Sequence, residues 1–196
     1  MSRTLVAAPL ALEEALIRSG ARHSRVRKTG MGPEKSIAAA AMLAEEPGER
    51  LVVLGFCGGL DAQSRPGEVI VADRVLATGD EGHAPVQADC DEAASLTERL
   101  AAAGLNVRRG PIVGVGKIAT GERREQLLAA GALAVDMESP WLAAGAAGRP
   151  FSVVRVVLDS PSHELMRPQA LGGALLAARV LRRVSGLVLQ DRGTEG

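Results

Sequence analysis

The stretch Val153-Val154-Arg155-Val156-Val157-Leu158-Asp159 is apolar and mostly β-branched, contains a single arginine, and ends in a carboxylate. Earlier in the chain, Ala134-Val135-Asp136-Met137-Glu138-Ser139 likewise leads from a short apolar run into two acids. Such runs predict buried strands, and an acid that directly follows one lies at the sheet edge where α/β proteins bind ligands. The two stretches therefore predict a cleft with carboxylates from consecutive elements, one to hold a sugar and one to protonate a leaving group.

Apolar runs and helical patterns alternate along the rest of the chain. We expect strands at residues 5–8, 23–28, 51–54, 68–72, 107–115, 133–135 and 151–158, and helices at residues 11–18, 34–44, 91–103, 122–130, 138–147 and 168–189. Pro33 suits the first position of a helix, and Gly104 and Gly131 are typical of residues that follow a helix end. Strands that alternate with helices form a mostly parallel sheet with helices on both faces. The sequence therefore predicts a single α/β domain over residues 1–196, with a mixed, mostly parallel twisted sheet flanked by helices.

The composition argues against several classes of protein. The chain has 196 residues, which fits one domain, and its 23 basic and 23 acidic residues give a net charge of zero. A nucleic-acid partner is therefore not expected, because phosphate binding calls for a basic surplus. The histidines His23, His83 and His163 and the cysteines Cys57 and Cys90 lack the spacing of a metal site or a disulfide scaffold.

Neither a membrane span nor a signal peptide is expected. The apolar run at 5–12 is short and leads directly into Glu13 and Glu14, which is typical of a first strand and helix. No stretch approaches the roughly 20 apolar residues of a membrane span. The basic amphipathic pattern of the C-terminal helix could lie on a membrane, but such a stripe more often faces a core. We expect a soluble, cytoplasmic protein.

Each acid in the two stretches also has a plainer interpretation. Asp159 precedes Ser160-Pro161 and could form a turn or cap a helix, whereas partial burial would favour a proton-donating role near neutral pH. Glu138 could simply complement the dipole of the helix that it begins. Met137 could belong to the core. Position alone does not decide between these interpretations.

The stretch Gly114-Val115-Gly116-Lys117-Ile118-Ala119 matches the G-x-G-x-x-A fingerprint of dinucleotide binding. It follows an expected strand, and Asp136 stands where the ribose-binding acid would stand. However, Thr120-Gly121 delays the helix, whereas the fingerprint requires a helix that begins within the glycine stretch and meets the pyrophosphate. An NAD(P)-dependent oxidoreductase is therefore the less favoured alternative.

Two glycine clusters, Gly30-Met31-Gly32 and Gly55-Phe56-Cys57-Gly58-Gly59, follow expected strands. Each could let the backbone approach a ligand or simply form a tight turn. The basic residues Arg25, Arg27 and Lys28 stand beside the first cluster and could meet an anion. A solvated edge strand would show the same pattern of charges.

Together these residues resemble the superfamily of purine nucleoside phosphorylases and methylthioadenosine/S-adenosylhomocysteine nucleosidases. The motifs occur in family order and span nearly the whole chain: Gly30-Met31-Gly32, Gly55 to Leu60, Pro66-Gly67-Glu68-Val69 with Val71-Ala72-Asp73, Val135 to Ser139, and Pro150-Phe151 through Arg155 to Asp159. The G-M-G-P turn, V-D-M-E-S and the R-V-V-x-D ending are most similar to the branch of hopanoid-associated nucleoside phosphorylases. In that branch the expected substrate is an adenosylhopane.

The resemblance implies a nucleoside phosphorylase-like fold and cleavage of the N-glycosidic bond of an adenine-type nucleoside, by phosphorolysis or hydrolysis. Asp159 would protonate or hydrogen-bond N7 of the leaving purine. Glu138 would bind ribose hydroxyls, Met137 would pack against the ribose, and Glu13 would be the water-orienting acid. The resemblance further places beside the substrate Asp136, Phe56, Cys57, Gly58 and the backbone of Ile118 and Ala119, which would read the adenine edge.

The chain departs from the family pattern where phosphate would bind. The position of a frequent serine in the glycine stretch is Phe56, and the arginine that some phosphorylases carry before it is replaced by apolar residues at 52–54. Ile118 stands where relatives have a base-stacking aromatic residue. These departures favour water as the nucleophile. A phosphate site would depend on other candidates, namely Gly30, Gly32, Arg25 and Arg27.

The resemblance also bears on partners. No cofactor and no metal are expected, and inorganic phosphate is the one co-substrate to consider. The family precedent predicts a homodimer or a larger homo-oligomer that acts on a small-molecule nucleoside. The main alternative is a non-catalytic nucleoside-binding module of the same fold, which would bind a nucleoside and release no base.

Overall fold

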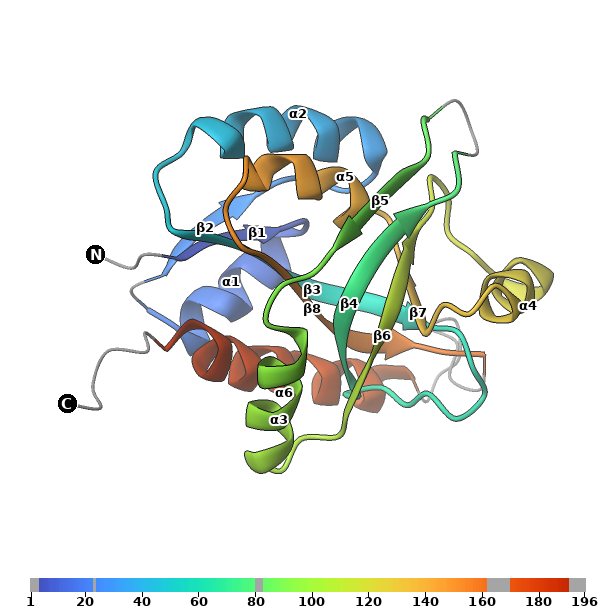
Figure 1. Cartoon of the computed structure of the whole chain (residues 1–196). Coiled ribbons are helices and arrows are strands. Elements are labelled where there is room, and N and C mark those ends of the chain that lie inside the picture. The colour runs from blue at the N-terminus through green and yellow to red at the C-terminus, as the bar shows by residue number, and fades with distance from the viewer. Residues whose placement is uncertain (1–3, 23, 80–82, 162–169, 191–196) are drawn as a thin grey trace.

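The computed structural model describes residues 4–22, 24–79, 83–161 and 170–190 and shows an α/β fold built on one sheet (Figure 1). The strands are β1 (Thr4–Ala8), β2 (Arg25–Lys28), β3 (Arg50–Gly59), β4 (Val69–Ala77), β5 (Val86–Asp89), β6 (Val107–Gly114), β7 (Ala134–Asp136) and β8 (Phe151–Asp159). The helices are α1 (Ala11–Gly20), α2 (Pro33–Glu45), α3 (Ala93–Ala102), α4 (Gly121–Ala129), α5 (Ser139–Leu142) with a 3-10 turn at Ala143–Ala146, and α6 (Ala170–Leu189). The predicted class, a mixed sheet flanked by helices, is confirmed.

The sheet is mixed and closes on itself. Its strand order is β2-β1-β3-β7-β6-β4-β5, and β8 pairs with both β3 and β4. The pairings β1–β2, β1–β3, β3–β8, β4–β6 and β6–β7 are parallel, whereas β3–β7, β4–β5 and β4–β8 are antiparallel. The strands β3, β8, β4, β6 and β7 therefore form a closed circuit, because each pairs with the next and β7 returns to β3. This circuit brings the ends of β3, β7 and β8 together.

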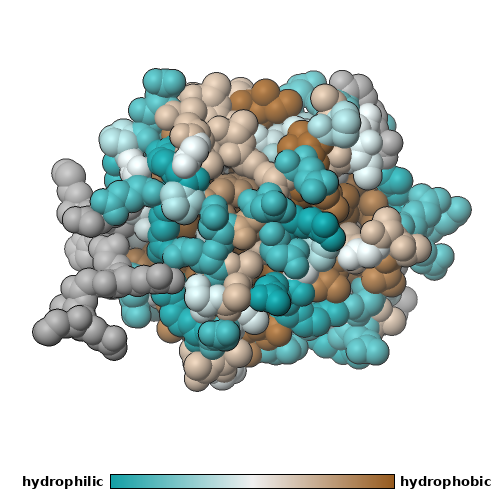
Figure 2. Space-filling view, in the orientation of Figure 1, coloured by the Kyte–Doolittle hydropathy of each residue, from teal (hydrophilic) through white to brown (hydrophobic). Residues whose placement is uncertain are grey.

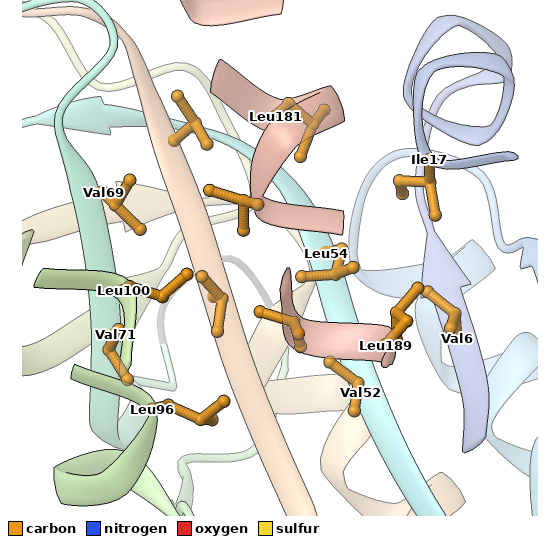
Figure 3. Close-up of a cluster of buried hydrophobic side chains, with 14 of the residues drawn as sticks. Val6, Ile17, Val52, Leu54, Val69, Val71, Leu96, Leu100, Leu181 and Leu189 are labelled. Atoms are coloured by element: carbon orange, nitrogen blue, oxygen red, sulfur yellow. The ribbon is translucent and has the colours of Figure 1, made fainter. Parts of the chain in front are cut away.

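Helices cover the sheet from two sides: α1, α3 and α6 lie on one side, and α2 and α5 on the other (Figure 1). The apolar strands serve both layers because successive side chains of a strand point to opposite faces. In β3, Val52 and Leu54 belong to the core under α1 and α6 (Figure 3). Leu51 and Val53 belong to the core under α2 and α5. Burial on both faces explains why these strands read as continuous apolar runs.

Two parts of the sheet were not predicted from the sequence. The strand expected at 51–54 continues through the second glycine cluster to Gly59, because β7 and β8 supply backbone partners on both sides. The strand expected at 68–72 continues to Ala77 and pairs with β5, which has no apolar run because it lies at the sheet edge with Gln87 and Asp89 exposed.

The C-terminal helix is largely a core element. Its buried face carries Ala177, Leu181 and Val184, whereas Leu171 and Leu175 near its start are exposed. No helix in the described part of the chain is long and apolar enough to cross a membrane. Within the same residues no cluster of histidine, cysteine or acidic side chains could hold a metal ion. His23 and His163 lie outside the described residues.

Candidate active site

A cavity of about 180 Å³ opens where β1, β3, β7 and β8 end. Every residue that we predicted for catalysis or nucleoside binding lines it: Glu13, Phe56, Cys57, Gly58, Ile118, Ala119, Asp136, Met137, Glu138 and Asp159. The other lining residues are Pro9, Leu10, Met31, Val115, Arg124, Val135 and Leu158. The closed strand circuit brings together residues that are far apart in the sequence.

One fully buried arginine, Arg155 of β8, organises the acids beside this cavity. Its Nη2 lies 2.8 Å from Asp136 Oδ2 and 3.4 Å from Glu138 Oε2, and it donates to the Ser139 hydroxyl at 3.0 Å. Its Nη1 is buried and has no hydrogen-bond partner in the described residues. We call Arg155, Glu13, Asp136 and Glu138 the Arg155 cluster, because the field of this guanidinium acts on all three acids. A buried donor without a partner is costly, and Arg155 itself is not among the residues that line the cavity.

The Glu13 side chain connects the start of α1 to strand β3 through two hydrogen bonds. Its Oε2 accepts the Leu10 N–H at 2.7 Å and so caps α1, and its Oε1 accepts the Phe56 N–H at 2.6 Å. Burial raises the pKa of Glu13, while Arg155 and the two backbone donors oppose that rise. The carboxyl is therefore fixed in place yet has a greater tendency to hold a proton than an exposed glutamate has.

Glycine at position 55 permits the approach of Glu13 and Arg155. A Cβ atom there would lie 2.4 Å from Glu13 Oε1 and 2.5 Å from Arg155 Nη1. Both distances are well below van der Waals contact, so any side chain would push these groups apart. The second glycine cluster therefore lets side chains come close to the backbone of an extended strand, and it does not form the tight turn that the sequence also allowed.

Glu138 lies at the start of α5, between Arg155 and the first glycine cluster. Its Oε1 accepts the Gly32 N–H at 3.3 Å, and its Oε2 lies 3.4 Å from Arg155 Nη2. Burial, together with the charges of Asp136 and Glu13, raises the pKa of Glu138 to about 7, although Arg155 acts in the opposite direction. Glu138 therefore changes its charge near neutral pH.

The raised pKa of Glu138 predicts a pH-dependent stability. The pKa of about 7 in the folded protein exceeds the ordinary value of 4.5, so the folded state holds this proton more tightly than the unfolded state does. The protonated Glu138 therefore stabilises the folded protein fully below pH 4.5, and this contribution is lost as the pH rises through 7. Glu138→Gln removes this titration. The free energy of unfolding of the variant relative to the wild type should rise by about 1–3 kcal/mol between pH 5 and pH 8. Urea unfolding at both pH values measures this; an identical difference at both would contradict it.

Asp136 is occupied by structural partners. Its Oδ1 accepts the N–H groups of Glu138 and Ser139, both at 3.1 Å, and its Oδ2 accepts the Ser139 hydroxyl and pairs with Arg155. These bonds fix the start of α5 and the direction of Glu138. Asp136 lines the cavity, but its carboxylate is engaged within the protein.

The dinucleotide alternative does not fit this geometry. The helix after the fingerprint begins at Gly121, beyond its last residue, so its N-terminus does not lie in the glycine stretch. A Cβ at Gly114 would lie 2.6 Å from Pro140, so this glycine serves packing against α5. Asp136, the expected ribose ligand of that motif, is bound to Ser139 and Arg155.

Asp159 at the end of β8 forms an ion pair that the sequence did not suggest. Its Oδ2 accepts a hydrogen bond from Arg124 Nη2 at 2.5 Å. Arg124 follows another arginine in the polar helix α4, a pattern typical of an exposed residue, yet its side chain is buried. Arg155 was likewise not assigned to the site, although a lone arginine in an apolar strand is a signal for a buried charge that needs acidic partners.

The predicted anion candidates do not assemble at the cavity. Arg27 Nε lies 2.7 Å from Glu46 Oε1, and Arg25 Nη1 donates to the Pro47 carbonyl at 2.6 Å. Both belong to the edge strand β2 and do not line the cavity, as the solvated-edge interpretation predicts. Gly32 reaches the site only through its N–H to Glu138, and Gly30 is not among the lining residues.

Comparisons with known proteins agree with this fold. The family described as the phosphorylase superfamily matches residues 14–184. No curated protein matches the chain. Among solved structures, the S-adenosylhomocysteine nucleosidase of Streptococcus pyogenes, in complex with 5-methylthiotubericidin, superimposes with a TM-score of 0.75 at 21% identity over 94% of this chain and 96% of that one.

Two further solved structures are similar over nearly their whole length. The 5'-methylthioadenosine/S-adenosylhomocysteine nucleosidase of Helicobacter pylori, with butyl-thio-DADMe-Immucillin-A, has a TM-score of 0.76 at 15% identity and covers 94% of this chain and 97% of its own. The corresponding nucleosidase of Neisseria meningitidis, with methylthio-immucillin-A, has a TM-score of 0.76 at 18% identity, covering 96% and 99%. At these identities the likeness establishes the fold.

Proposed function

Because this chain belongs to the phosphorylase superfamily, we propose that it is an enzyme that hydrolyses the N-glycosidic bond of a 5′-substituted adenine nucleoside. The observation that carries the proposal is the joint presence in one cavity of Asp159 and of the acids of the Arg155 cluster. Solved proteins with this fold are named as nucleosidases of methylthioadenosine and S-adenosylhomocysteine, which supports the substrate class.

On the base side, Asp159 supplies the proton. As the C1′–N9 bond breaks, its electron pair passes into the purine, and N7 takes the proton so that adenine leaves as a neutral base. The backbone of Ile118 and Ala119 reads the adenine edge. The Ala119 carbonyl already accepts Arg124 Nε at 2.8 Å, so the Ala119 N–H and the Ile118 backbone are the groups that meet the base.

On the sugar side, Glu138 holds the ribose hydroxyls and Met137 packs against the ring. The sugar gains positive charge in the transition state, as in other glycoside cleavages. The acids of the Arg155 cluster stabilise that charge more strongly than they stabilise the neutral substrate. Glu138 is held by the Gly32 N–H and by Arg155, so it is oriented before the substrate binds.

We propose that the nucleophilic water binds between Glu13 and Arg155 Nη1. These groups lie on the same side of β3 above Gly55, and Nη1 is a buried donor without a partner in the described residues. A water molecule there would donate to Glu13 and accept from Arg155. The oxygen attacks C1′ and its proton passes to Glu13, whose pKa is raised by burial, so that it accepts a proton more readily than an exposed glutamate does.

The charges of the cavity support water over phosphate. Four acidic side chains line it, and Arg124 is the one basic residue among the described lining residues. Arg124 is already paired with Asp159. A phosphate dianion would meet more negative than positive charge here, whereas water carries none.

The mouth of the cavity supports an apolar 5′ substituent. Leu10 and Met31 line the cavity with 39% and 49% of their surface exposed. Both stand beside acids of the site, since the Leu10 N–H binds Glu13 and the Gly32 N–H, next to Met31, binds Glu138. We therefore include an adenosylhopane with the alkylthio nucleosides as a candidate substrate.

The proposal is tested by chromatographic detection of adenine released from adenosine, methylthioadenosine, S-adenosylhomocysteine and an adenosylhopane. We expect release that is independent of added phosphate and faster for nucleosides with apolar 5′ groups. Thermal stabilisation by a nucleoside without release of adenine would instead identify a binding module. Release that requires phosphate would overturn the assignment of water as the nucleophile.

We also propose that the protein self-associates through an apolar groove between α2, α5 and β5. Ile37, Ala41, Val86 and Trp141 are among its lining residues. Figure 2 shows hydrophobic side chains over α2 and beside the β4–β5 hairpin. The mass of one chain is 20.3 kDa, and light scattering of the wild type should give twice that mass. Ile37→Arg, which places a charge in the groove, should give the mass of one chain, and a wild-type mass of one chain would contradict the proposal.

A further inference from the structure

Arg124 connects three segments of the active site. Its Nε donates to the Ala119 carbonyl at 2.8 Å, its Nη1 to the Gly59 carbonyl at 3.3 Å, and its Nη2 to Asp159 Oδ2 at 2.5 Å. These acceptors lie before α4, at the end of β3 and at the end of β8. The side chain is only 8% exposed. Because a guanidinium is planar and rigid, these bonds fix Asp159 relative to the segment that reads the base.

The backbone of β3 leaves room for this ion pair. A Cβ at Gly58 would lie 3.0 Å from Arg124 Nη2 and 3.3 Å from Asp159 Oδ1. The register of β3 against β8 shifts between Cys57 and Gly58, at the point where Gly58 pairs with Asp159. A glycine and a strand irregularity thus coincide with the pair.

The two oxygens of Asp159 have different surroundings. Oδ2 is bound to Arg124, whereas Oδ1 accepts no hydrogen bond from the described part of the chain. The Asp159 side chain lines the cavity, and 19% of its surface is exposed to solvent. One oxygen is therefore held by the protein, and the other is open to a ligand.

We propose that Arg124 is a positioning residue for protonation of the leaving base, a role that rests on the proposed function. Arg124 holds Oδ2, so when Asp159 takes up a proton for catalysis it takes it on Oδ1, the oxygen that is left for the ligand. When the C1′–N9 bond breaks, this proton moves to N7 and Asp159 becomes a carboxylate. Arg124 compensates that negative charge. Asp159 regains a proton from solvent and Glu13 loses its proton to solvent, which restores the enzyme.

The test compares two substrates that differ at N7, one of which needs a proton there for its base to leave and one of which does not. A nucleoside methylated at N7 already carries the positive charge, and its base leaves without protonation. Arg124→Met should lower kcat for the unmodified nucleoside by about 100-fold. For the N7-methylated nucleoside kcat should fall by less than about fivefold, because no proton transfer is needed. KM should stay within about threefold for both, since Arg124 acts through Asp159.

Three controls keep the outcomes distinct. Arg124→Lys retains the positive charge, and its kcat for the unmodified nucleoside should be at least about tenfold higher than that of Arg124→Met. Arg123→Met, at the neighbouring position of α4, should leave both rates unchanged, and circular dichroism should show that each variant is folded. Equal losses on the two substrates, or no loss on either, would overturn the role of Arg124 while the proposed function stands. If the wild type releases base from neither nucleoside, the proposed function fails and this inference fails with it.

Discussion

Asp159→Asn should lower the rate of adenine release by about 10³-fold or more. The asparagine amide has no acidic proton to give to N7. It retains an oxygen that can accept from Arg124 Nη2, which now bonds Oδ2 at 2.5 Å, so the fold should persist. The measurement is kcat by chromatography on purified variant and wild type, with thermal unfolding as the check on folding.

A matched control shows whether the loss of one negative charge by itself lowers the rate. Asp89→Asn removes the same charge from an exposed position on β5 and should leave kcat unchanged. If Asp159→Asn retains more than about a tenth of the wild-type rate, proton donation by Asp159 is refuted, because general acid catalysis contributes at least about 100-fold.

Arg155→Met should cause the largest loss of stability. Arg155 is fully buried, and its Nη2 lies 2.8 Å from Asp136 Oδ2 and 3.4 Å from Glu138 Oε2. Without the guanidinium, the acids of the Arg155 cluster face one another unpaired. Removal of one partner from a buried ion pair costs about 3–5 kcal/mol, a large part of the about 5–15 kcal/mol that stabilises a domain. Urea unfolding at pH 8 measures the loss.

A second variant identifies the cause of that loss. The double variant Arg155→Met with Glu138→Gln removes one of the stranded carboxylates and should recover part of the stability at pH 8. The recovery should shrink at pH 5, where the raised pKa of Glu138 already leaves this group protonated. A loss below about 1 kcal/mol for the single variant would show that Arg155 does not balance the acids.

The order of the main elements and the acids that follow the two apolar runs could be predicted from local patterns, whereas Glu13 was assigned only through the family resemblance. The run that ends at Asp159 and the run before Glu138 are strands β8 and β7, and both acids line the cavity. These features depend on neighbours in sequence: an apolar run predicts a buried strand, and the residue after it lies at the sheet edge.

The remaining features depend on contacts between distant segments. Arg124 resembles an exposed helical arginine until the end of β8 is placed beside it, and β5 lies at the sheet edge without an apolar run. Gly55 and Gly58 look like turn residues because glycine weakens a strand. Their use for side-chain approach emerges only when β7 and β8 pair with β3 and hold it extended.

Attack of water on C1′ with cleavage of the C1′–N9 bond is tested most directly by identifying both products of one reaction. The purified protein is incubated in phosphate buffer with the tested adenine nucleoside that binds most tightly, and the products are analysed by mass spectrometry. Free adenine together with the free 5′-substituted ribose, formed by the wild type and not by Asp159→Asn, is the predicted result. An intact nucleoside, or a sugar 1-phosphate in place of the free sugar, would contradict the account.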